Sequence, residues 1–172
     1  MTDAASRDIG TTPPRITILG VGNILLSDEG VGVRVVEALY RRYEFADHVR
    51  VLDGGVLGVR LMGIVSDTDI LIVVDAVCNR GAPGDLYRLA DHQVPRRVLA
   101  KQSMHQMDLP EVLALCRAID HDPHVVVVGV EPEDISTVSD RLTPTIAAKV
   151  DDLIGLVLQE LDRLGASYQL KP

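Results

Sequence analysis

The fold is decided by residues 15–32, which read Arg15-Ile-Thr-Ile-Leu-Gly-Val-Gly-Asn-Ile-Leu-Leu-Ser-Asp-Glu-Gly-Val-Gly32. An apolar run closed by two nearby glycines predicts a buried strand that ends in a tight turn. Apolar residues then recur every three or four positions over residues 29–43, the pattern of an amphipathic helix. Ser27 or Asp28 can cap this helix. The stretch therefore predicts a strand, a glycine turn and a helix.

The alternation of strands and helices continues to the end of the chain. Strands are predicted at 49–52, 69–75 and 124–130, an edge strand at 85–89, and helices over 57–65, after a capping box at 108–111, and from Thr143-Pro144 to about Gly165. The strand at 69–75 holds five consecutive aliphatic residues, which is typical of a parallel sheet covered on both faces.

These elements predict one α/β domain, a three-layer sandwich with a twisted, mostly parallel sheet and helices on both faces. We expect the domain to span residues 15–165. Residues 1–14 are expected to be a flexible N-terminal tail, and residues 166–172 a C-terminal tail.

Composition excludes several classes of function. A net charge of −8 and an aromatic content of 3% argue against nucleic-acid binding. The longest apolar runs are far shorter than the roughly 20 residues that span a bilayer, and the N-terminus lacks the apolar segment of a secretory signal. The two cysteines, Cys78 and Cys116, are too few for a disulfide framework and fit a reducing cytoplasm. Cys78 could be a thiolate near the site, but we interpret it as a small buried residue.

Polar side chains gather where the predicted strands end. They are Asn23, Asp28, Glu29, Asp53, Asp75 and Glu131. Ligands of such sheets bind at the carboxyl ends of the strands, so this clustering is the first functional signal. Glu29 and Asp75, joined by His105 from a later loop, could converge on a divalent metal ion.

Each of these residues also has a structural interpretation. Glu29 can complement the helix dipole, Asp28 can cap a helix, and Asp53 can form a turn with its own backbone. His105 alone fits a loop histidine. Asp75 favours function more strongly, because a carboxylate that follows five aliphatic residues is costly to desolvate.

A dinucleotide-binding interpretation is disfavoured, although the Gly20-Val-Gly22 turn invites it. The third glycine of that motif is missing, since position 25 is Leu. Asp28 and Glu29 would also place negative charge where a phosphate must sit.

Several segments together resemble the hydrogenase maturation endopeptidases. These segments are Gly20–Gly32, Asp53-Gly-Gly55, Asp75-Ala76, His105-Gln106 and Gly129-Val-Glu-Pro132. The resemblance runs in order from about Ile16 to Leu164. It implies an aspartic-type endopeptidase that removes a C-terminal extension from the large-subunit precursor of nickel-iron hydrogenase after nickel insertion.

The resemblance also implies a division of roles at the site. The family's metal site matches Glu29, Asp75 and His105. Carboxylates and one imidazole make a weak cage, so we expect the nickel to be supplied by the substrate rather than held permanently. Asn23, Asp28, Asp53, Gly54 and Gly55 are expected to shape the substrate cleft.

Two other functions remain open from the residues. A non-proteolytic nickel or maturation chaperone would need the same ligands and cleft but would cut nothing. A metallopeptidase with another client could use the same scaffold. We expect a cytoplasmic monomer that meets its client transiently, since the apolar helix faces are accounted for as core.

Overall fold

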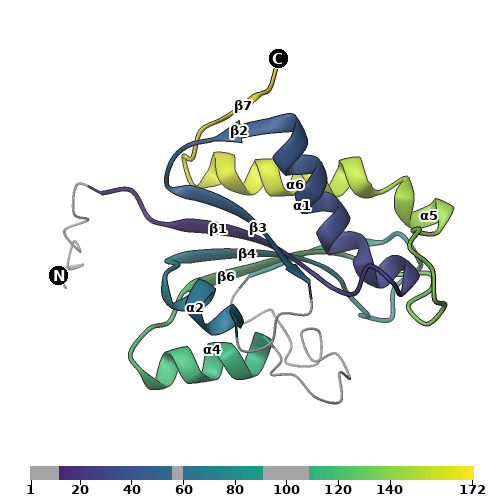
Figure 1. Cartoon of the computed structure of the whole chain (residues 1–172), viewed down its shortest axis with the longest axis horizontal. Coiled ribbons are helices and arrows are strands. Elements are labelled where there is room, and N and C mark those ends of the chain that lie inside the picture. The colour runs from purple at the N-terminus through teal and green to yellow at the C-terminus, as the bar shows by residue number, and fades with distance from the viewer. Residues whose placement is uncertain (1–11, 56–59, 91–108) are drawn as a thin grey trace, which may run out of the picture.

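The computed structural model describes residues 12–55, 60–90 and 109–172 (Figure 1). Its centre is a five-stranded sheet in the order β3-β1-β4-β6-β5. The strands are β1 (Ile16–Val21), β3 (Val49–Gly55), β4 (Ile70–Ala76), β5 (Leu86–Ala90) and β6 (His124–Val130). The pairs β1–β3, β1–β4 and β4–β6 are parallel, and β5 is antiparallel to β6 at the edge. The predicted mostly parallel sheet and its edge strand are confirmed.

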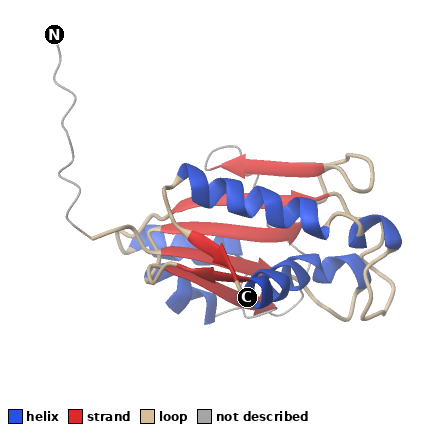
Figure 2. Cartoon of the chain, turned by 90° about the horizontal axis from the view of Figure 1, so that it is seen from above, coloured by secondary structure: helices blue, strands red, loops and turns tan. Residues whose placement is uncertain are grey.

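Helices cover both faces of the sheet. On one face lie α1 (Val31–Arg42) and α6 (Val150–Arg163), and on the other α2 (Arg60–Ser66) and α4 (Leu109–Ala118) (Figure 1). Figure 2 looks down on α1 and α6 with the strands beneath them. The three-layer sandwich is therefore confirmed. Within the described parts of the chain, none of the helices has the length and apolar character needed to cross a membrane.

The two faces of β4 explain its unbroken aliphatic run. Ile72 and Val74 pack into the core beneath α1 and α6, whereas Leu71 and Val73 pack into the core beneath α2 and α4. All four side chains are fully buried. A strand in the middle layer must be apolar on both sides, and this is the reason that period-two alternation is absent.

Helix α1 lies unusually close to the sheet because two glycines meet there. A Cβ placed on Gly32 would lie 2.1 Å from the carbonyl oxygen of Val74, and one placed on Gly20 would lie 2.3 Å from the carbonyl oxygen of Gly32. No side chain fits at either position. Gly20 in β1 and Gly32 in α1 therefore allow the helix to pack closely on the strands.

The predicted C-terminal tail at 166–172 is wrong in part. Tyr168–Leu170 forms strand β7, which pairs antiparallel with β2 (Tyr43–Phe45) in a separate two-stranded sheet. The rings of Tyr43 and Tyr168 pack edge to face with centroids 5.9 Å apart. Aromatic cross-strand contacts of this kind stabilise short ribbons. Each strand has only three residues, which is too short to produce a sequence pattern.

The last predicted helix is divided into two. Its start is confirmed, since Thr143 caps α5 (Pro144–Ala147) by accepting a hydrogen bond from the Ile146 N–H at 3.4 Å. The Lys149 N–H then donates to the carbonyl of Ile146 at 2.9 Å, three residues back. This tighter bond interrupts the helical ladder, so α6 begins anew at Val150.

Substitution of Gly32 tests the close contact of α1 with the sheet. Gly32→Ala should lower the free energy of unfolding by about 3 kcal/mol, because its Cβ would overlap the Val74 carbonyl and force α1 outward. Urea unfolding of purified variants measures this. Gly155→Ala in α6 is the matched control, since nothing lies within 4 Å of its Cβ. It should be neutral or stabilise by up to about 1 kcal/mol. Equal effects of the two changes would contradict the packing argument.

Candidate functional site

The sheet has a topological switch point between β1 and β4. The chain leaves β1 through α1 to reach β3 on one side, and then returns through α2 to β4 on the other side of β1. The connections from the carboxyl ends of β1 and β3 therefore lead to helices on opposite faces of the sheet (Figure 1). Open α/β sheets bind their ligands at the carboxyl ends of the strands next to such a switch point.

Two of the three predicted metal-recognition residues lie at the switch point. Asp75 is the penultimate residue of β4 and is 2% exposed. Glu29 is half-buried in the 3-10 helix Ser27–Gly30, which follows β1 and contacts β4. His105 lies outside the described residues. Within residues 12–55, 60–90 and 109–172, no three His, Cys, Asp or Glu side chains are placed to hold a metal ion.

Asp28 is not a helix cap, contrary to our interpretation. The residue before α1 is Gly30, and no side chain caps that helix. Asp28 is instead fully buried and accepts four hydrogen bonds from residues of the loop that follows β6. The donors are the N–H of Glu133 at 3.0 Å, the N–H of Asp134 at 2.9 Å, and the N–H and hydroxyl of Thr143 at 2.7 and 3.0 Å.

These bonds give Asp28 a clear physical role. A buried carboxylate is tolerated only where hydrogen bonds replace its hydration, and here backbone donors and a hydroxyl do so. Asp28 thus fastens the loop of residues 131–143 to the 3-10 helix that carries Glu29. The sequence could not reveal this, because the donors lie more than a hundred positions away.

Asn23 and Asp53 form turns at the same edge of the sheet. The Asn23 side-chain oxygen accepts a hydrogen bond from the Leu25 N–H at 3.0 Å, and the Asp53 carboxylate accepts one from the Gly55 N–H at 2.8 Å. Gly55 has a φ of +40°, in the left-handed region that favours glycine. A Cβ on Gly54 would lie 2.8 Å from the Leu19 side chain. The turn-forming interpretation of Asp53 is confirmed, and its predicted part in the substrate cleft stays a prediction.

Glu131 and Tyr87 form a polar pair whose connection the sequence did not reveal. The Tyr87 hydroxyl donates to the Glu131 carboxylate at 2.7 Å, and the Asn79 N–H donates to the same oxygen at 2.8 Å. Burial alone would raise the pKa of Glu131, but these and further backbone hydrogen bonds hold it below its ordinary value. Burial and the adjacent carboxylate raise the pKa of Tyr87 to about 12. Glu131, which directly follows β6, thus joins β5 through Tyr87 and the loop after β4 through Asn79.

The two cysteines differ in their surroundings. Cys116 is buried in α4, and its burial raises the pKa of the thiol. Cys78 is exposed, so our interpretation of it as a buried residue is wrong. It comes three residues after Asp75, where β4 has ended and the chain has left the core.

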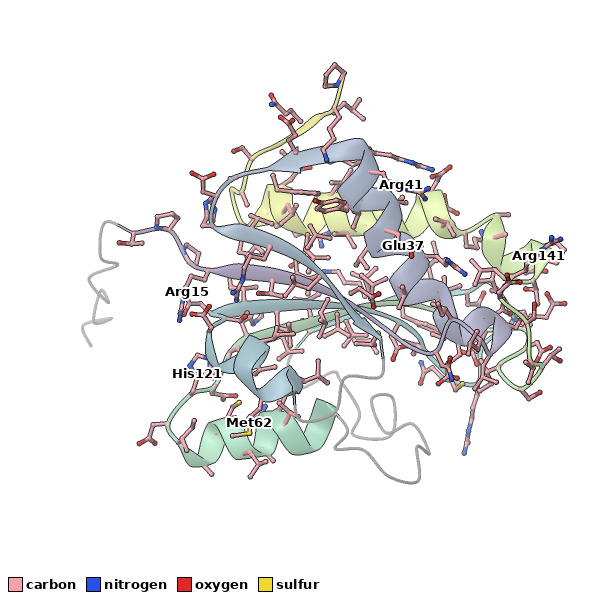
Figure 3. All side chains as sticks on the ribbon, viewed as in Figure 1. Arg15, Glu37, Arg41, Met62, His121 and Arg141 are labelled. Atoms are coloured by element: carbon pink, nitrogen blue, oxygen red, sulfur yellow. The ribbon has the colours of Figure 1, made fainter. Side chains whose placement is uncertain are left out.

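At the amino ends of the strands, opposite the candidate site, the polar side chains contact one another. Arg15 forms ion pairs with Asp67 and Asp69, the latter at 2.9 Å. Figure 3 shows Arg15 and His121 near these ends, and His121 Nε2 lies 2.9 and 2.8 Å from the carbonyl oxygens of Val65 and Thr68. The polar groups here bind one another. They hold the amino ends of the strands together, and the carboxyl edge is the candidate site.

The fold and this edge define an α/β protein with acidic side chains at a topological switch point. Comparison with known proteins identifies the family. A family model described as hydrogenase maturation protease matches residues 33–160. The hydrogenase 2 maturation protease of Escherichia coli is 42% identical over 153 residues, which cover 88% of this chain and 93% of that protein. The HupD hydrogenase expression/formation protein of Thiocapsa roseopersicina is 40% identical over 154 residues, covering 88% and 70%.

A solved structure agrees with these sequence matches. The hydrogenase maturating endopeptidase HybD of E. coli superposes with a TM-score of 0.84 at 41% identity, covering 91% of this chain and 98% of that one. The chain belongs to the hydrogenase maturation protease family. It is thus a peptidase, as the sequence resemblance implied.

Replacing Asp28 should loosen the carboxyl edge. Asp28→Asn puts an amide among donor groups, leaves at least one buried donor unpaired, and should lower the free energy of unfolding by about 3 kcal/mol. Urea unfolding, with amide exchange at Asp134 and Thr143, measures both the global and the local effect. Asp151→Asn is the control, since its side chain is 78% exposed and should change stability by less than about 0.5 kcal/mol. Unchanged exchange at Asp134 would contradict the fastening role.

The Tyr87–Glu131 pair predicts a pH-dependent stability. Because the pKa of Glu131 is depressed in the folded state, its contribution is present above the ordinary value of 4.5 and is lost as the pH falls through the folded-state value. Tyr87→Phe should therefore lower the free energy of unfolding by about 1 kcal/mol at pH 7 and by less at about pH 3. Urea unfolding at both pH values measures the difference. Tyr40→Phe, at a residue that is 67% exposed, should be neutral at both. A Tyr87→Phe loss that is equally large in acid would show that the charge of Glu131 does not strengthen the hydrogen bond from Tyr87.

Proposed function

We propose that this peptidase removes the C-terminal extension of the nickel-iron hydrogenase large-subunit precursor after nickel insertion. One observation carries the proposal: the chain matches 93% of the length of the E. coli hydrogenase 2 maturation protease at 42% identity. The same alignment covers 88% of this chain. The client class and the nickel requirement come from the family resemblance of the sequence.

In this proposal Glu29, Asp75 and His105 recognise nickel that the precursor carries. Carboxylates and imidazole are suitable ligands for a divalent ion, yet the set has no thiolate and only one imidazole to hold it tightly. The burial of Asp75 at the carboxyl end of β4 supports a functional role, because open α/β sheets bind their ligands at the carboxyl ends of their strands. Nickel loading would then be the condition for cutting.

The proposed reaction is hydrolysis of one peptide bond. Water adds to the scissile carbonyl, the carbon–nitrogen bond breaks, and the departing amine takes up a proton. A carboxylate at the switch point, Glu29 or Asp75, takes the proton from the attacking water and passes it to the amine, as an aspartic-type endopeptidase would. Asn23, Asp28 and the turn 53–55 shape the cleft that holds the precursor's chain.

The proposal extends to the setting of the enzyme. Neither Cys78 nor Cys116 is part of a disulfide, which supports a reducing compartment and thus the cytoplasm. We also propose that the enzyme works as a monomer and meets the precursor transiently.

Intact mass spectrometry of the precursor tests the proposed function. Nickel-loaded precursor incubated with this protein should lose a C-terminal peptide, and nickel-free precursor should not. Glu29→Ala, Asp75→Ala and His105→Ala should each slow the cut by about a hundredfold or more. Asp151→Ala is a matched control, because it removes an exposed carboxylate that pairs with Arg42 at the last residue of α1.

The alternatives give different results in the same experiment. A chaperone would bind the precursor without cutting it, and the three variants would weaken binding alone. An ordinary metallopeptidase would retain a stoichiometric metal ion after dialysis and would cut nickel-free precursor. Either result would overturn nickel-gated processing.

A further inference from the structure

Four large apolar side chains are exposed on two loops at the carboxyl edge of the sheet. We call them the apolar rim: Ile24, Leu25, Ile135 and Val138, which are 39%, 58%, 42% and 82% exposed. Ile24 and Leu25 belong to the loop after β1, and the other two belong to the loop after β6. The peptidase chemistry proposed above uses none of them.

Hydrogen bonds join the two loops into one surface. The Ser139 N–H donates to the Leu25 carbonyl at 3.0 Å, and the Ser27 N–H donates to the Ser139 carbonyl at 2.9 Å. Together they form a parallel bridge between Leu26 and Ser139. In this register the residues one step earlier, Leu25 and Val138, are neighbours. The two most exposed members of the rim thus lie beside each other.

Hydrogen bonds of Asp28 and Asp134 hold the loop after β6, which carries half of the rim, in place. Asp28 anchors the second loop, as described above, and the Asp28 N–H donates to the Asp134 carbonyl at 3.0 Å. The Asp134 carboxylate in turn accepts hydrogen bonds from the N–H groups of Ser136 and Thr137 at 2.9 and 3.0 Å. The loop's shape is therefore fixed before any partner arrives, which reduces the entropy lost on binding.

The rim borders the candidate active site. Glu29 directly follows Asp28, the residue that fastens the two loops together. Figure 3 places Arg141, at the end of the second loop, on the side of the molecule opposite Arg15 and the amino ends of the strands. A substrate whose cleavage site reaches Glu29 would therefore meet the rim.

We propose that the apolar rim docks an apolar surface of the hydrogenase large-subunit precursor next to its cleavage site. This inference rests on the proposed function, since it names the surface by which the same site holds its client. A peptidase that selects one bond of one client protein needs contact beyond the scissile bond. Exposed apolar side chains that are clustered and rigidly supported supply it. Pairing with a second copy is disfavoured, because a dimer at the rim would cover the edge that the client must reach.

Paired substitutions test the rim with the full-length enzyme and nickel-loaded precursor. The double variant Leu25→Ser and Val138→Ser should raise KM by about tenfold, equivalent to about 1.4 kcal/mol of binding, and leave kcat within about twofold. The matched control is Ile119→Ser with Leu170→Ser, at residues that are 61% and 69% exposed on other parts of the molecule. The control should leave both parameters within about twofold. The melting temperatures of both variants should stay near that of the wild type, since the changed side chains are exposed.

The other outcomes are informative. An unchanged KM in the rim variant, or an equal rise in the control, would overturn the docking role while wild-type cleavage upholds the proposed function. A dimer that sedimentation detects in the wild type, and that the rim variant loses, would assign the rim to self-association and overturn the proposal. If the wild type binds the precursor without cutting it, a tenfold weaker Kd in the rim variant would still support docking. If the wild type neither cuts nor binds, both proposals fall.

Discussion

The approach of Gly32 to the carbonyl of Val74 is the contact on which the rest of the structure depends. It brings the first turn of α1 against β4 at the residue just before Asp75. The 3-10 helix that carries Glu29 ends two residues before Gly32, so its distance from β4 is set by the same contact. Any side chain at position 32 would lift the helix from the sheet and move one carboxylate away from the other. The packing of α1 on β4 therefore also sets the position of Glu29 relative to Asp75.

Asp28 extends this arrangement to the loop after β6. Four donors converge on its carboxylate from Glu133, Asp134 and Thr143, so a charge that is fully buried loses little of its solvation. The consequence is that segments far apart in sequence share one support at the carboxyl edge. The amino ends of the strands are held differently. There, exposed ion pairs such as Arg15–Asp69 contribute only a modest stabilising free energy.

The sequence predicts the elements that carry strong local patterns and fails where partners are remote. The aliphatic run of β4, the Thr143 cap and the position of Asp75 at a strand end could all be predicted, because each depends on neighbouring residues. The buried role of Asp28, the Tyr87–Glu131 pair and the β2–β7 ribbon could not, because each depends on a residue that only folding brings near. The capping interpretation of Asp28 used only neighbouring residues. It was wrong because the hydrogen-bond partners of Asp28 are remote in sequence. The predicted role of His105 lies outside the described residues.

A site of two carboxylates and one imidazole has little affinity of its own for a soft or borderline metal ion. In the function we propose, this low affinity is useful, because a site that bound nickel tightly would remove it from the precursor whose nickel it recognises. The free energy that holds the client must then come from elsewhere on the surface. In the same proposals, the turns at Asn23 and Asp53 would shape the cleft, and the apolar rim would supply area that can be removed from water. Since Asp28 fastens the rim to the segment that carries Glu29, docking of the client and inspection of its metal use the same rigid support. The two proposals thereby assign client binding and metal recognition to different side chains at the carboxyl ends of the strands, so that each could change without weakening the other.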